Sequence, residues 1–101
     1  MVLHHLEIPD AKVAEFCRRY FIRRLSLFGS ILRPDFSPAS DIDVLVEFKE
    51  GHVPALEFFD MEAELSHLLG RKVDLHTPGF LSRYFREEVR SGAKVVYADT
   101  R

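Results

Sequence analysis

The stretch LFGSILRPDFSPASDIDVLVEF, residues 27–48, decides the fold of this chain. One apolar run ends at Gly29 and Ser30, and ten residues later Asp41 and Asp43 open a second apolar run. Glycine lets a backbone approach an anion closely, and carboxylates are typical ligands of hard divalent cations. The pattern therefore predicts a phosphate-binding turn that faces a metal-binding pair of carboxylates.

Each half of this pattern is weak by itself. Gly29-Ser30 is also an ordinary strand-to-helix turn, in which glycine relieves strain and serine caps the helix. Asp41 and Asp43 alone are equally well explained as the solvated face of a strand. Together, the two halves place phosphates against a metal ion, which is the arrangement that phosphoryl chemistry requires.

Two strands are predicted to carry the carboxylates. Residues 41–48 alternate as a half-buried strand does, with Ile42, Val44 and Val46 on one face and Asp41, Asp43, Leu45 and Glu47 on the other. A second alternating strand over residues 72–76 aims Asp74 toward the same side. Because residues two apart lie roughly 6.5 Å from each other and adjacent strands ~4.8 Å apart, the three carboxylates converge. Such a cluster repels itself, which favours a bound Mg²⁺ or Mn²⁺ ion.

Further elements flank this stretch. A helix is predicted after Asp10, its N-cap, and its apolar stripe comprises Val13, Phe16, Cys17, Tyr20 and Phe21. A strand over 24–28 leads into a short helix at Gly29-Ser30, and a loop reaches residue 40. Two later stripes predict helices: Phe58, Met61, Leu65 and Leu68 before Gly70, and Leu81, Tyr84, Phe85 and Val89. An edge strand over 95–97 follows.

This order predicts one α/β (α+β) domain over residues 1–101, with a single small mixed sheet of about four strands and helices packed mainly on one face. The composition, 47% hydrophobic and 30% charged with a net charge of −2, is typical of a soluble globular protein. No apolar run approaches the ~20 residues of a membrane span, and the first residues do not resemble a signal peptide. We expect a cytoplasmic protein without a membrane partner.

Two surface features leave alternatives open. A basic group beside the first helix comprises Lys12, Arg18, Arg19, Arg23 and Arg24. The favoured interpretation is a solvated helix face, and the weaker one is a direct contact with nucleic acid, so no nucleic-acid partner is expected. The predicted edge strand at 95–97 either stays solvated or pairs with a second copy of the chain.

At this point the residues resemble a known signature, that of the polymerase-β-type nucleotidyltransferases. The resemblance rests on Gly29-Ser30, ten intervening residues, Asp41-Ile42-Asp43 and a later Asp74, and it is similar in detail to the minimal nucleotidyltransferases (MNT). It implies the nucleotidyltransferase fold and Mg²⁺- or Mn²⁺-dependent transfer of AMP from ATP, a nucleoside triphosphate, to a hydroxyl group. In MNT antitoxins, the acceptor is a tyrosine of a HEPN-type toxin encoded nearby.

The resemblance assigns roles to six residues: Gly29, Ser30 and Arg33 for the nucleotide, and Asp41, Asp43 and Asp74 as metal ligands and catalytic residues. The chain departs from the family pattern at Ile31 and Pro34, which puts nucleotide affinity and base preference in question. His76 follows Asp74 on the same strand face, and a structural role is the favoured interpretation for it.

Two other functions remain open beside protein adenylylation. One is a binding module with a vestigial site that neutralises its partner by occlusion, with Phe58/Phe59 and Tyr84/Phe85 as anchors. The other is transfer of AMP to the hydroxyl group of a small molecule.

Overall fold

The computed structural model describes residues 2–4, 6–37, 39–80, 87, 89 and 91–99. The elements follow the order β1 (Val2–Leu3), β2 (Leu6–Glu7), α1 (Asp10–Arg19), β3 (Ile22–Phe28), η1 (Gly29–Leu32), β4 (Ile42–Phe48), α2 (Glu57–Leu69), β5 (Val73–His76), η2 (Pro78–Phe80) and β6 (Lys94–Ala98). Of the last predicted helical stripe, Leu81, Tyr84 and Phe85 lie outside the described residues.

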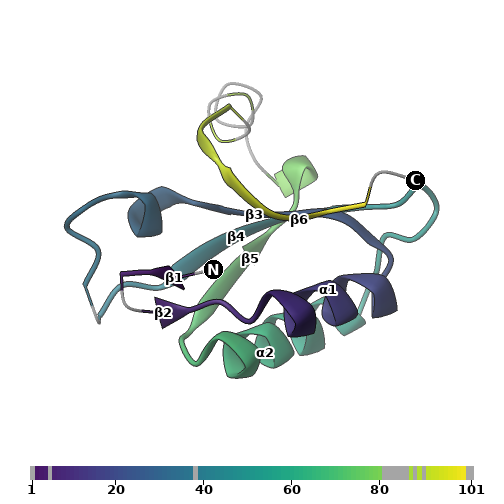
Figure 1. Ribbon diagram of the computed structural model, residues 1–101. Helices are drawn as coiled ribbons and strands as arrows, with labels where there is room; N and C mark the ends of the chain where they lie inside the picture. The colour runs from purple at the N-terminus through teal and green to yellow at the C-terminus, as the bar shows by residue number, and fades with distance from the viewer. Residues whose placement is uncertain are drawn as a thin grey trace.

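Four strands form a mixed sheet in the order β5-β4-β3-β6. β4 runs parallel to β5, whereas β3 runs antiparallel to both β4 and β6. Figure 1 shows α1 and α2 side by side beneath this sheet. The predicted fold class, a small mixed sheet with helices mainly on one face, is confirmed.

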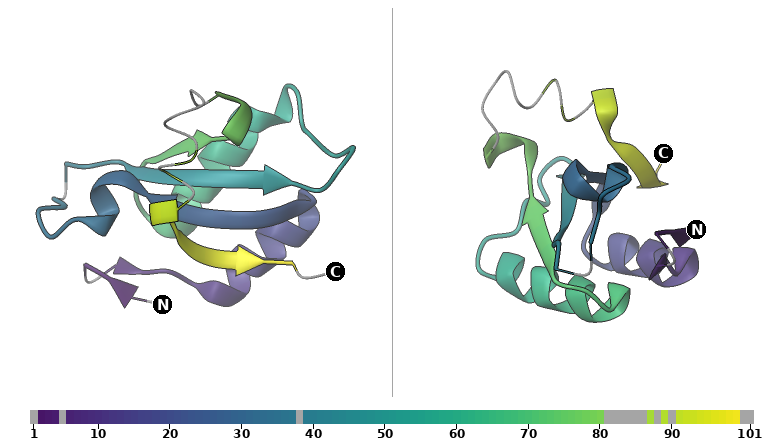
Figure 2. Two further views of the ribbon diagram at one scale, coloured as in Figure 1. Left: turned by 90° about the horizontal axis from the view of Figure 1, so that it is seen from above. Right: turned by 90° about the vertical axis from the view of Figure 1, so that its left-hand side faces the viewer.

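The main core lies between the sheet and the two helices. The predicted inner face of β4 is fully buried, since Ile42, Val44 and Val46 have no exposed surface. Opposite them lie the stripes of α1 and α2, which contribute Val13, Phe16, Cys17, Met61, Leu65 and Leu69. The views in Figure 2 show both helices on the same side of the sheet, so its other side is available for a site.

The boundary between α1 and β3 differs from the prediction. The helix ends at Arg19 rather than at Phe21, and β3 begins at Ile22, two residues earlier than expected. Phe21 has a left-handed backbone with φ of 58° and is exposed, and its ring stacks on His52 at 4.2 Å between centroids. A bulky residue in this conformation ends a helix, which the apolar spacing alone does not reveal.

The second face of the sheet is only partly open. Phe28, Leu45 and Val89 form a small buried cluster there, and Glu47 is 6% exposed beside the guanidinium groups of Arg23 and Arg24. The alternation of the strand places Glu47 on its polar face, where a solvated side chain is expected, but Glu47 is buried and the two arginines compensate its charge. The β1–β2 hairpin was not predicted. In the described part of the chain, no helix is long and apolar enough to cross a bilayer.

Candidate active site

The turn after β3 brings the backbone of Gly29 close to the carboxylate of Asp43. Gly29 has a φ of 75°, which only glycine adopts readily, and it starts the short helix η1 predicted at this position. A Cβ atom at Gly29 would collide with the carboxylate of Asp43. The glycine is therefore required both for the left-handed turn and for the close approach of η1 to β4.

Sheet register brings Asp43 and Asp74 together. Phe28, the last residue of β3, pairs with Asp43 across the antiparallel ladder, and Asp43 pairs with Asp74 across the parallel one. Paired positions on adjacent strands lie on the same face of a sheet. Asp43 thus stands between the Gly29 turn on one side and Asp74 on the other, as the strand alternation predicted.

His76 completes a cluster with these two carboxylates. Its Nε2 atom lies 3.2 Å from Asp74 Oδ2 and 3.7 Å from Asp43 Oδ1. One ligand atom from each of the three residues lies within 4.8 Å of the others. Nε2 of His76 is shielded from solvent and makes no well-aligned hydrogen bond with a described residue. A buried, unsatisfied ring nitrogen facing two carboxylates fits a divalent cation between them.

The electrostatics of Asp43 agree with this interpretation. Burial raises the pKa of the Asp43 carboxyl, the charges of Asp74 and Asp41 raise it further, and His76 opposes them. Crowded carboxylates hold negative charge poorly without a counter-charge. A cation bound among these groups removes the repulsion that otherwise favours proton uptake.

Asp41 lies apart from this cluster in the described structure. It precedes β4 and is exposed, and its Oδ2 atom lies 3.7 Å from the ammonium group of Lys72. Its main-chain carbonyl accepts a hydrogen bond from the Ser30 hydroxyl at 3.4 Å, which ties η1 to the start of β4. Asp41 remains a predicted metal ligand, close enough to influence the pKa of Asp43.

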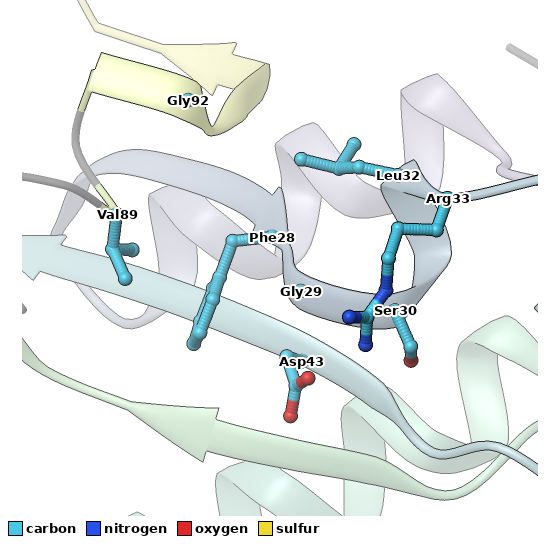
Figure 3. A pocket seen from close by; sticks show the side chains of 8 residues that line it. All are labelled: Phe28, Gly29, Ser30, Leu32, Arg33, Asp43, Val89 and Gly92. Carbon is cyan, nitrogen blue, oxygen red and sulfur yellow. The ribbon is translucent and has the colours of Figure 1, made fainter.

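A cavity of about 450 Å³ opens beside Asp43. It is lined by Phe28, Gly29, Ser30, Leu32, Arg33, Asp43, Val89 and Gly92. Figure 3 shows the guanidinium group of Arg33 near Ser30, with Phe28 and Val89 on the far side of Asp43. The cavity therefore presents a carboxylate, hydrogen-bond donors and apolar side chains together, which suits a metal ion, phosphates and a flat base.

Sequence reasoning did not assign every residue of this site. Phe28 and Val89 were predicted only as parts of apolar elements and Leu32 was given no role, because nothing in the sequence pattern distinguishes a cavity wall from a core position. His76 was noted as sharing the face of Asp74, but its spacing alone did not outweigh a structural role. The Asp74-Leu75-His76 alternation was the available signal.

The comparisons with known proteins agree with this geometry. The family model described as "Nucleotidyltransferase domain" matches residues 11–96 of the chain. Protein adenylyltransferase MntA of Thermococcus cleftensis is 38% identical over 77 residues, which cover 74% of this chain and 76% of that protein.

Solved structures show the same fold. A structure described provisionally as a minimal nucleotidyltransferase is 33% identical, has a TM-score of 0.70 and is matched over 83% of this chain and 85% of its own. A toxin–antitoxin structure with AMP-PNP has a TM-score of 0.72 at 20% identity, with 91% and 75% of the two chains covered. A tri-AMPylated Shewanella oneidensis HEPN toxin in complex with MNT antitoxin has a TM-score of 0.64 at 21% identity, with 89% and 70% covered.

The family model spans most of the chain, and the Thermococcus relative and the provisionally described structure each exceed 30% identity over more than two thirds of their own lengths. The chain is thus an enzyme of the nucleotidyltransferase family, and the relatives that it resembles within this family are named protein adenylyltransferases.

Proposed function

We propose that the chain transfers AMP from ATP to a tyrosine hydroxyl of a partner HEPN toxin and thereby acts as an antitoxin. The observation that carries the proposal is the position of Asp43 between the Gly29 turn and Asp74, at the wall of a cavity large enough for a nucleotide. The names of the relatives and of the structural neighbours, with AMP-PNP in one and an AMPylated HEPN toxin in another, support the same choice.

The proposed reaction has a simple balance. The acceptor oxygen attacks the α-phosphorus of ATP, a new O–P bond forms, and the bond to the β-phosphate bridging oxygen breaks to release pyrophosphate. The acceptor proton passes to Asp74, which is half-exposed and so accessible to an incoming hydroxyl group. Ser30 and Arg33 donate hydrogen bonds to phosphate oxygens, and Arg33 holds the developing negative charge.

The residues present fit a divalent cation, because Asp43 and Asp74 offer converging carboxylate oxygens and Asp41 lies two residues before Asp43, just ahead of β4. Asp41, Asp43 and Asp74 would hold Mg²⁺, which would neutralise the negative charge of the triphosphate. We expect these three carboxylates to orient the triphosphate so that its α-phosphate faces the acceptor.

The test is an assay of label transfer with purified protein. The chain is incubated with Mg²⁺, ATP labelled at the α-phosphate and the HEPN protein encoded beside it, and the partner is expected to gain label and the mass of one AMP. Asp41→Asn combined with Asp43→Asn should abolish transfer, whereas Asp60→Asn on the exposed face of α2 should not. Absence of label, or label that persists in the double variant, would contradict the proposal.

One observation favours the second candidate, neutralisation by occlusion. Val53, Leu56 and Phe59 are each at least 74% exposed, next to a cavity of about 280 Å³ that Phe59 helps to line. The double variant separates the two functions. If it still neutralises the partner fully without transferring label, occlusion is the function; if neutralisation disappears with transfer, adenylylation is.

A further inference from the structure

The cluster of possible metal ligands includes His76, which is not among the ligands that the family signature implies. The ligand set implied by the family signature consists of aspartates alone, whereas the structure groups Asp43 and Asp74 with an imidazole and leaves Asp41 beside Lys72. Asp43, Asp74 and His76 come from two neighbouring parallel strands, at positions that the register fixes on one face. The grouping therefore follows from the sheet and not from a flexible loop.

The imidazole ring is held in a fixed orientation. The ring of Phe28 meets it edge to face at 5.3 Å between centroids, and the His76 side chain is 26% exposed. The strand that carries it is anchored to α2, because Glu62 Oε2 accepts the N–H of Leu75 at 2.9 Å and Ser66 Oγ accepts that of Val73 at 2.9 Å. The strand is thus fixed in position, and in the structure Nε2 faces the two carboxylates.

The separations suit shared coordination. Two ligands that each lie ~2.1 Å from one ion are at most ~4.2 Å apart, and Nε2 is 3.2 Å and 3.7 Å from its two carboxylate neighbours. All three ligand atoms fall within 4.8 Å of one another, so a small rotation of one side chain brings them into range. A neutral imidazole is also the side chain that most often binds transition metals.

We propose that Nε2 of His76 is a direct ligand of the divalent cation held by Asp43 and Asp74, and that this nitrogen makes the site prefer Mn²⁺ to Mg²⁺. Mg²⁺ binds oxygen ligands almost exclusively, while Mn²⁺ accepts imidazole nitrogen as well as carboxylate oxygen. The inference builds on the proposed nucleotidyl transfer in taking this cluster as its cation site.

The competing role for His76 is that of a positioning residue. In that case the ring holds Asp74 in place through a shared proton and never contacts the ion. Nε2 lies between both carboxylates, 3.2 Å from Asp74 Oδ2 and 3.7 Å from Asp43 Oδ1, rather than beside Asp74 alone, which favours coordination over this role. Coordination leaves a spectroscopic signature that positioning does not.

The decisive experiment is pulsed electron paramagnetic resonance of Mn²⁺ bound to the full chain, with and without an uncleavable ATP analogue. We expect echo modulation from a directly bound ¹⁴N nucleus, which changes to the ¹⁵N pattern when the protein contains ¹⁵N-histidine. That label separates protein nitrogen from adenine nitrogen. His76→Gln should remove the signal, and His67→Gln, the same change at an exposed position of α2, should retain it.

Calorimetry provides the selectivity measurement. His76→Gln is expected to lower the affinity for Mn²⁺ at least about tenfold and the affinity for Mg²⁺ by much less, so that the preference is lost. The inference is overturned if histidine nitrogen never couples to Mn²⁺, or if His76→Gln weakens both ions equally. Label transfer measured on the same wild-type samples reports separately on the proposed function, since transfer can persist when no nitrogen is coordinated.

Discussion

Asp43 lies at a position where its charged carboxylate lowers the stability of the metal-free protein. Burial and the nearby charges of Asp74 and Asp41 raise its pKa, and the attraction of His76 only partly offsets them. A group whose charged form is disfavoured in the folded state lowers the free energy of unfolding at neutral pH. Carboxylates are retained in such positions when their chemistry requires it.

Asp43→Asn should therefore separate function from stability. We expect nucleotidyl transfer to fall at least ~100-fold, because a charged ligand of the triphosphate-bound cation is lost. The metal-free variant should be as stable as the parent or up to ~1 kcal/mol more stable, because a desolvated charge is removed. Urea denaturation and the transfer assay measure the two effects. A variant that unfolds more easily than the parent without metal would contradict this account.

The raised pKa of Asp43 predicts that the free energy of unfolding depends on pH. Because the pKa of Asp43 in the folded state lies above its ordinary value of 3.8, the folded chain binds more protons than the unfolded chain between those two values. The contribution of Asp43 to the free energy of unfolding thus falls as the pH rises through that window. The stability advantage of Asp43→Asn should grow with pH there and then level off, as urea denaturation at successive pH values can measure. An advantage that shrinks with rising pH would refute the assignment.

Gly29 offers a second test at a single residue, with a matched control. Gly29 and Gly70 both have φ near 70°, but a Cβ atom meets the Asp43 carboxylate at Gly29 and nothing within 4 Å at Gly70. Alanine at either position should cost ~1 kcal/mol of stability for the left-handed backbone. Only Gly29→Ala should also displace Asp43 and weaken binding of metal and nucleotide, as measured by calorimetry. Equal binding by the two variants would show that the close approach has no function.

At the scale of the elements, hydrogen bonds between side chains of α2 and the backbone of β5 hold Asp74 in position. β5 is an edge strand of the sheet, and two of its N–H groups, those of Val73 and Leu75, are bonded by Ser66 and Glu62 of the helix. These bonds flank Asp74 on both sides along the chain. Side chains of the helix thereby replace the missing neighbour strand and protect the edge from pairing elsewhere.

Substitution of Glu62 tests whether the hydrogen bond between α2 and β5 supports the strand. In Glu62→Ala the N–H of Leu75, a residue only 5% exposed, loses its acceptor, which should cost ~1–3 kcal/mol and reduce transfer through Asp74. Glu62→Gln is the control, because its amide oxygen can still accept the bond. Thermal unfolding and transfer assays of both variants check the prediction. Equal destabilisation by Ala and Gln would mean that the hydrogen bond does not support β5.

Local sequence patterns predicted the elements well where hydrophobic period and turn residues agreed. β4 turns Ile42, Val44 and Val46 to the core as expected, although Leu45 and Glu47 on its other face are buried as well. α2 ends at Gly70 in the left-handed conformation, and β6 forms the far edge. The common face of Asp43 and Asp74 was predictable because strand alternation fixes it, whereas their direct pairing depends on the parallel register, which the structure shows.

Features that depend on contacts across the chain were not predictable in this way. Glu47 follows the polar side of the alternation, and only its position next to Arg23 and Arg24 explains its burial. The bracing of β5 by α2 joins side chains up to thirteen positions apart and has no periodic signature. The closeness of His76 Nε2 to two carboxylates is likewise a product of register and ring orientation together.

For the molecule as a whole, most arginines of the basic group are paired with acidic side chains. Arg19 pairs with Glu64 at 2.7 Å, and Arg23 and Arg24 lie 4.0 and 3.6 Å from Glu47. Three arginines of the basic group therefore have acidic neighbours, and the net charge is −2. Arg23 and Arg24 lie in β3 and not on the predicted helix face, and the pairing of all three arginines disfavours a contact with nucleic acid, since unpaired cations are what bind phosphate backbones.

Apolar exposure is concentrated elsewhere on the molecule. We call the group Val53, Leu56 and Phe59 the apolar patch. Val53 and Phe59 help to line the cavity of about 280 Å³, whose lining also includes Phe48 at the end of β4 and Thr77, which follows His76. The cavity beside the apolar patch therefore adjoins the end of the strand that carries Asp74 and His76. If a protein is the acceptor, a large side chain exposed here is a suitable anchor for it.

Phe59→Glu tests the patch as the contact with the acceptor protein. Phe59 is 75% exposed, so the substitution should change stability by less than ~0.5 kcal/mol, yet burying a charge should weaken partner binding at least about tenfold. Val95→Glu, the same new charge on an exposed residue of the opposite sheet edge, is the control and should bind normally. Affinity is measured by calorimetry in an Asp43→Asn background, so that the partner stays unmodified. The prediction is wrong if Phe59→Glu binds the partner normally. If Val95→Glu then binds weakly, the partner contacts β6 instead of the apolar patch.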